Sequence, residues 1–183
     1  MSYEDITHYV EDHDLKLFMD DRSVDYITNA DNKDKFNVYL AEECAELIKE
    51  LTKMERGIGS KCRVEEEIGD VIISIERFVT IYKNDLSQDK RNNLDVDKLC
   101  VKTTEPLKES DVKDLIKRLG ILIYNAMDYD CNGTVSLPVM SVQLDIQCVW
   151  VLINKIIDKY ELSRDYIKRH YTSTITEIIE GSK

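Results

Sequence analysis

The sequence predicts an all-α protein, a bundle of amphipathic helices. Two observations lead to this prediction. The 183 residues include only two prolines and six glycines, whereas Leu, Ile, Lys and Glu are frequent; Pro and Gly are the residues that most disfavour helices. Apolar residues also recur at helical spacing in several long segments, so each of these helices has one face to bury against a neighbour.

The chain divides by composition into four segments, which we expect to form one compact domain. The first is polar and acidic and contains a possible short helix at about residues 4–19. The third is a charged connector, marked by the loop-forming run that begins at Asn84 and by Pro106, which limits any helix before it. The segments are 1–34 (polar), 35–83 (helix pair), 84–106 (connector) and 107–183 (second helical half).

The helix pair consists of helices predicted at residues 35–56 and 64–83, joined by a short Gly-containing link. Each helix carries one apolar stripe, so we expect the two stripes to pack against each other. The first stripe is Leu40, Cys44, Leu47, Leu51 and Met54, and the second is Ile68, Val71, Ile72, Ile75, Val79 and Tyr82.

Acidic residues border both stripes. Glu43 and Glu46 lie three residues apart on the first helix, and Glu67 and Asp70 have the same spacing on the second. Like charges one turn apart destabilise a helix by roughly 0.2–0.5 kcal/mol per pair. Four converging carboxylates therefore favour a hard cation with oxygen ligands, Mg²⁺ or Mn²⁺. The alternative interpretation is a solvated acidic face on an acidic protein.

The arrangement Glu42-Glu43-x-x-Glu46, followed by Glu67-x-x-Asp70, resembles the signature of the MazG-like, all-α nucleoside triphosphate pyrophosphohydrolases. Dimeric dUTPases share this superfamily. The resemblance covers the stretch from Asn37 to Tyr82. It implies a MazG-like helical bundle and hydrolysis of a nucleoside triphosphate between its α and β phosphates, which gives a monophosphate and pyrophosphate.

The resemblance also implies roles for individual acids. Glu43, Glu46, Glu67 and Asp70 would hold Mg²⁺, and Glu42 would orient or deprotonate the attacking water. The ion would bridge the carboxylates to phosphate oxygens and neutralise the developing charge. No Gly-rich phosphate-binding loop is present in the sequence, so a P-loop nucleotide hydrolase is not expected.

Three further residues are candidates for substrate contacts. Lys53 and Arg56 follow the acids on the same helix and could contact phosphate. The alternative is that they form an ordinary basic helix end, favoured by the helix dipole. Asn37, five residues before the first acid, is a candidate for base recognition.

The second half is predicted to contain helices at residues 108–127, about 139–160 and about 163–180. Residues 115–121 align with residues 40–46, and residues 143–146 align with residues 67–70. The second half could therefore be a degenerate copy that keeps the packing surface and loses the metal site. Any two amphipathic helix pairs can also align this well. The four aligned metal positions carry Arg118, Ile121, Gln143 and Ile146.

A degenerate copy would have consequences for assembly. It would act as a built-in partner for the first pair, and a monomer would become possible; otherwise a homodimer or larger oligomer is expected. Lys117 and Arg118 could then face the substrate phosphates from across the bundle.

The segment from Asp128 to Ser136 resembles the start of an EF-hand calcium loop. However, Val139 stands where that loop needs a bidentate Glu, and Pro138 precedes it. The alternative is an Asn-Gly turn between two helices.

Net charge and cysteine content limit the partners and the cellular compartment that we expect for the protein. With 25 basic and 36 acidic residues, the formal charge of −11 disfavours binding to nucleic acid polymers or anionic membranes. The sequence has five cysteines without a Cys-x-x-Cys pair, no basic and apolar leader and no long apolar run. These features suggest a cytoplasmic protein.

The expected function is Mg²⁺-dependent pyrophosphohydrolysis of a nucleoside triphosphate. One alternative is a dUTPase-like or dCTPase-like specialist of the same fold. The other is a catalytically silent helical module that binds nucleotide or calcium. The four acids favour an enzyme, whereas the loop after Asp128 is the feature that favours the silent module.

Overall fold

A computed structural model describes residues 35–88, 111–129 and 139–181. These residues form five helices and no strand, which confirms the all-α class. The helices are α3 (Phe36–Glu55), α4 (Lys61–Gln88), α5 (Asp111–Tyr129), α6 (Val139–Lys159) and α7 (Arg164–Ile179).

Several predictions fall outside the described residues. These are the polar segment 1–34 with its possible short helix, residues 89–106 of the connector, and most of the calcium-loop-like segment. Within the described ranges, none of the helices combines the length and apolar character needed to cross a membrane.

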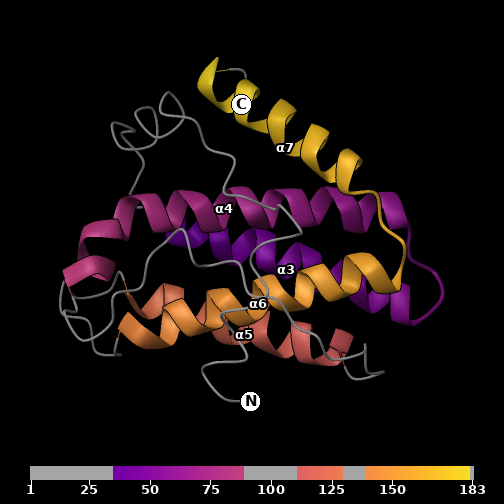
Figure 1. Ribbon diagram of the computed structural model, residues 1–183, viewed down its shortest axis with the longest axis horizontal. Helices are drawn as coiled ribbons and strands as arrows, with labels where there is room; N and C mark the ends of the chain where they lie inside the picture. Colours follow the sequence, from indigo (N-terminus) through magenta and orange to yellow (C-terminus); the bar gives the residue numbers. More distant parts are fainter. Residues whose placement is uncertain (1–34, 89–110, 130–138, 182–183) are drawn as a thin grey trace.

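Four of the helices pack as two pairs. Helix α3 packs on α4 and α5 packs on α6, while α3 also contacts α5 and α4 contacts α6. Figure 1 shows α4 extending across the molecule, with α5 and α6 on one side of it and α7 inclined on the other. The apolar stripes of the four bundle helices meet in one continuous core, which includes Leu40, Leu47, Ile68, Ile72, Leu115, Leu119, Val149 and Ile153.

The end of α3 determines how the first pair forms. Gly57 adopts a left-handed conformation (φ 72°) just after the cap residue Arg56. The amide of Gly57 donates to the Met54 carbonyl at 2.9 Å, and that of Ile58 donates to the Lys53 carbonyl at 3.0 Å. This Schellman motif satisfies the last carbonyls of the helix and reverses the chain, so α4 returns alongside α3.

The predicted helix ends differ from the structure mainly at α4. This helix begins at Lys61 and continues to Gln88, so residues 84–88 of the predicted connector are helical. Residue propensity is a weak guide at helix ends, and helical hydrogen bonding continues here through residues that favour loops. Met127, at the end of the helix predicted at residues 108–127, is 39% exposed near the end of α5.

Helix α7 is held against α4 from its first residue. Ser163 caps the helix by accepting a hydrogen bond from the Tyr166 amide at 3.2 Å. Its own amide donates to the Glu65 carboxylate on α4 at 2.6 Å. Further along, Gly69 allows close approach, because a Cβ there would lie 2.9 Å from the Cδ2 atom of the His170 ring.

Candidate metal centre

Three of the predicted acids converge where α3 and α4 meet. Glu43 comes from α3, and Glu67 and Asp70 come from α4. One carboxylate oxygen from each lies within 4.8 Å of the other two. The three side chains are half-buried, because each borders an apolar stripe that is packed in the seam between the helices. We call these three residues the acid cluster.

The carboxylates of the acid cluster repel one another. The pKa of Glu43 is raised to about 7, chiefly by burial and then by the charges of Asp70 and Glu67, with smaller effects from Glu42 and Glu46. The pKa of Glu67 is also raised, first by burial and then by the charges of Glu46 and Asp70. In the absence of a cation, the three carboxylates therefore resist being ionised together.

The donor set fits a hard divalent cation. Three carboxylate oxygens match the oxygen preference of Mg²⁺ and Mn²⁺, whereas thiolate or imidazole groups would favour softer ions. Half-burial leaves one side open, and Mg²⁺ in nucleotide enzymes keeps open positions for water and substrate phosphates. A cation would also remove the repulsion that raises the pKa of Glu43.

Glu46, the fourth predicted ligand, is held by a neighbouring base. Its Oε2 lies 2.7 Å from Lys49 Nζ, which in turn lies 3.9 Å from the buried Glu50. The tight convergence therefore involves three acids, with Glu46 at its edge, close enough for its charge to raise the pKa of Glu67. Glu42 is exposed on α3, next to the acid cluster in sequence.

The structure does not bring the other predicted contacts to the acid cluster. Lys53 is paired with the buried Glu50 at 2.6 Å. Arg56 is exposed at the end of α3, about 20 Å along the helix axis from Glu43. Asn37 is buried in the first turn of α3, where its side-chain oxygen accepts a hydrogen bond from the Val38 amide at 2.8 Å.

Two basic residues that the sequence did not single out contact the predicted acids. Lys49 follows Glu46 by three residues, a spacing at which an ion pair could have been anticipated. His170 comes from α7, and its Nε2 lies 3.0 Å from Asp70 Oδ1. No local pattern could have revealed this contact, because it depends on how two helices distant in sequence pack.

Arg118, the candidate phosphate contact of the second half, is engaged within the second helix pair. It lies 3.3 Å from Asp145 of α6, whose other oxygen accepts from Asn125 at 2.6 Å. Asp145 is buried, so these partners compensate a charge at the α5–α6 interface. Ile146, which aligns with Asp70, is part of the core, and Lys117 is exposed.

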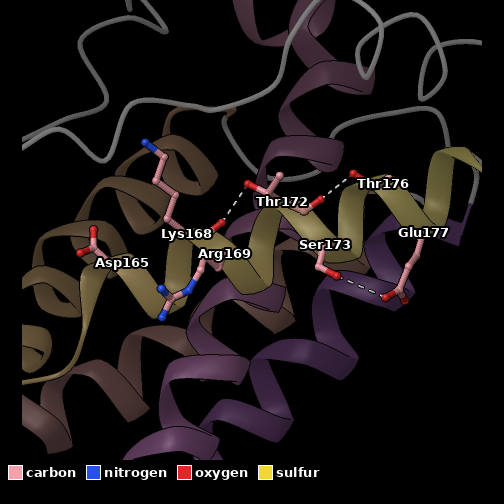
Figure 2. A pocket seen from close by; sticks show the side chains of 7 residues that line it. All are labelled: Asp165, Lys168, Arg169, Thr172, Ser173, Thr176 and Glu177. Atoms are coloured by element: carbon pink, nitrogen blue, oxygen red, sulfur yellow. Dashed lines mark hydrogen bonds between the residues drawn. The ribbon is translucent and has the colours of Figure 1, made fainter.

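A separate hollow of about 610 Å³ lies on the outer face of α7 (Figure 2). The hydroxyls of Thr172 and Thr176 donate to carbonyls of their own helix at 2.9 and 2.8 Å, and Ser173 lies 3.4 Å from Glu177. None of the lining residues belongs to the acid cluster, and their charges are mixed. They are Asp165, Lys168, Arg169, Thr172, Ser173, Thr176 and Glu177.

Comparisons with known proteins found no match to a protein-family model, to a curated protein or to a solved structure.

Proposed function

We propose that the protein is a Mg²⁺-dependent nucleoside triphosphate pyrophosphohydrolase that releases pyrophosphate and leaves a nucleoside monophosphate. The observation that carries this proposal is the convergence of Glu43, Glu67 and Asp70 within 4.8 Å. The resemblance of the two acidic motifs to those of the MazG-like enzymes supports it. Mn²⁺ is an acceptable substitute for Mg²⁺, and the free cysteines are compatible with a reducing cytoplasm.

Charge balance explains why this chemistry needs a cation. The acid cluster and a triphosphate are both anionic and would repel each other. A divalent ion supplies the positive charge that joins them and lowers the pKa of a water molecule. In this scheme Glu43, Glu67 and Asp70 would hold the ion. The raised pKa of Glu43 favours its protonated form, so Glu43 must lose that proton when the ion binds.

The residues around the acid cluster take supporting roles. Glu42, exposed beside Glu43, orients the attacking water or accepts its proton. Lys49 is half-exposed at the edge of the acid cluster, and we assign it the contact with the terminal phosphates. This role suits Lys49 better than Lys53 or Arg56, because Lys53 and Arg56 lie about 15 and 20 Å along the helix axis from Glu43.

The proposal is tested by measuring pyrophosphate release from a panel of ribonucleoside and deoxyribonucleoside triphosphates with Mg²⁺. Glu43→Gln and Asp70→Asn keep the size of the side chains and remove ligand charge, so both should abolish release. Asp114→Asn is the matched control, because Asp114 is exposed on α5 away from the acid cluster, and it should retain activity. Release that survives in Asp70→Asn would contradict the proposal.

The same panel distinguishes the alternatives. Turnover confined to dUTP or dCTP would identify a specialist of the same chemistry. A folded protein that binds metal and turns over none of the nucleotides would favour the catalytically silent binding module.

A further inference from the structure

His170 approaches the acid cluster from a different helix. Its Nε2 lies 3.0 Å from Asp70 Oδ1, and both side chains are about one-quarter exposed (26% and 25%). The contact depends on Gly69, since a Cβ at that position would lie 2.9 Å from the Cδ2 atom of the His170 ring. A glycine next to Asp70 therefore leaves the space in which the imidazole reaches the carboxylate.

The chemistry of the pair fixes the direction of the hydrogen bond. A carboxylate that binds a cation is ionised and only accepts hydrogen bonds, so toward such an Asp70 the ring nitrogen is the donor to Oδ1. This bond engages Oδ1 of the carboxylate. Because the bond restricts rotation of the Asp70 side chain, the whole carboxylate is held in one orientation. Hydrogen-bonded partners of this kind orient metal-ligating carboxylates.

Other hydrogen bonds hold α7 against α4, so the docking of α7 does not depend on the contact between His170 and Asp70 alone. The Ser163 amide donates to Glu65 at 2.6 Å, and the Tyr166 hydroxyl donates to Glu66 at 2.9 Å. These two hydrogen bonds join α7 to α4 without touching the acid cluster. A third hydrogen bond joins the Tyr171 hydroxyl of α7 to the buried carboxylate of Glu76 on α4.

We propose that His170 is a positioning residue that holds the Asp70 carboxylate in the orientation in which it shares a divalent cation with Glu43 and Glu67. The proposal rests on the proposed function, because it assumes that the acid cluster binds a cation. It makes the C-terminal helix part of the metal centre, although α7 itself supplies no acid to the cluster.

The test is titration of the full chain with Mn²⁺. Binding is measured by calorimetry and by the electron paramagnetic resonance signal of the free ion. His170→Leu removes the donor, and we expect it to weaken Mn²⁺ binding by about 10–100-fold, the range typical of lost outer hydrogen bonds. His170→Gln can place an amide donor where Nε2 lies and should restore affinity close to that of the wild type. Tyr166→Phe, which removes a neighbouring α4–α7 hydrogen bond, should leave affinity unchanged.

Should His170→Leu not fold, His170→Asn replaces it, since its amide is one carbon too short to reach Asp70. Equal Mn²⁺ affinity in the wild type and in the variant without the donor would overturn the positioning role alone. Equal losses in the Gln and Leu variants would also overturn it, because the donor would then not matter. A wild-type chain that binds no Mn²⁺ would overturn both this inference and the proposed function.

Discussion

Glu43 is the residue that makes the charge of the acid cluster sensitive to pH. Its pKa is raised to about 7, chiefly by burial and then by the neighbouring acids. In the unfolded chain the same carboxyl has a pKa near 4.5. The folded state therefore binds this proton more tightly than the unfolded chain, and folding stability depends on pH between these two values.

The sign of this dependence can be measured in the metal-free protein. The contribution of Glu43 to stability is fully present below pH 4.5 and is lost as the pH rises to about 7. Glu43→Gln removes the ionisation, so we expect it to raise the free energy of unfolding at pH 8 by roughly 1–2 kcal/mol after allowance for solvent exposure. Near pH 4.5 the difference should vanish. Urea unfolding at both pH values provides the comparison, and a destabilised variant at pH 8 would contradict it.

Cation binding should release the same proton. At pH 6 the Glu43 carboxyl is mostly protonated, so Mg²⁺ must displace a proton, and affinity should rise as the pH passes through about 7. Calorimetry in two buffers with different ionisation enthalpies measures the number of protons released. A value near zero at pH 6 would show that Glu43 does not bind the ion.

For individual residues, the sequence predicts the features of the site that local spacing determines. Glu43, Glu67 and Asp70 follow from acids three residues apart beside apolar stripes. The ion pair between Glu46 and Lys49 also follows from a spacing of three residues. Local spacing does not rank Lys49 against a cation as the partner of Glu46. His170 had no local signal at all.

Among the helices, α6 ends with a strained residue. Glu161 has φ 51°, in the left-handed region, and the amide of the next residue, Leu162, donates to the Ile157 carbonyl at 2.9 Å. This is the position that Gly57 occupies at the end of α3. A side chain there costs roughly 1 kcal/mol relative to glycine.

Glu161→Gly should therefore stabilise the protein by about 0.5–1 kcal/mol, since the ion pair that Glu161 forms within the described residues, with Lys61 at 4.0 Å, is highly exposed. Glu180→Gly is the control, because Glu180 has a right-handed conformation (φ −77°) and glycine there should be neutral or destabilising. Thermal melts of both variants measure the effect. Destabilisation by Glu161→Gly would contradict the strain.

The α5–α6 pair depends on the ion pair between Arg118 and Asp145. Arg118→Ala should lower the free energy of unfolding by about 1–2 kcal/mol, because the buried Asp145 would lose its charged partner and, within the described residues, keep the hydrogen bond from Asn125. Lys117→Ala, at the exposed neighbour, should be close to neutral. An unchanged KM and kcat in Arg118→Ala would remove its phosphate role, whereas a raised KM with unchanged stability would restore it.

The existence of the helices could be predicted because apolar stripes repeat over many turns. The stripe residues Leu40, Cys44, Leu47 and Leu51 are all fully buried in α3. The ends of α4 could not be predicted, because helix ends depend on weak local preferences.

For the whole molecule, the main question is what covers the first helix pair. Helices α5 and α6 pack on α3 and α4 within one chain, as a built-in partner would. In the described part of the chain, the exposed large apolar residues are Val38, Ile58, Tyr124 and Met127. We therefore predict a monomer of 21.3 kDa by light scattering at micromolar concentration. Twice that mass would show that a second chain is still required.

The sequence predicted a bundle but not the place of α7. Its packing on α4 relies on Gly69 and on hydrogen bonds between residues about one hundred positions apart. Such contacts follow from three-dimensional packing, which neither helical period nor composition describes. The acid cluster is formed by neighbouring helices in sequence, and it could therefore be anticipated.

The most direct test of the proposed function is to determine which phosphate bond of a nucleoside triphosphate, incubated with the protein, is broken. Phosphorus NMR of a turned-over triphosphate, with and without Mg²⁺, separates pyrophosphate and monophosphate from orthophosphate and diphosphate. We predict pyrophosphate and monophosphate only, formed when Mg²⁺ is present and absent in Asp70→Asn. Orthophosphate with a diphosphate, or turnover that does not need the metal, would contradict the role assigned to Glu43, Glu67 and Asp70.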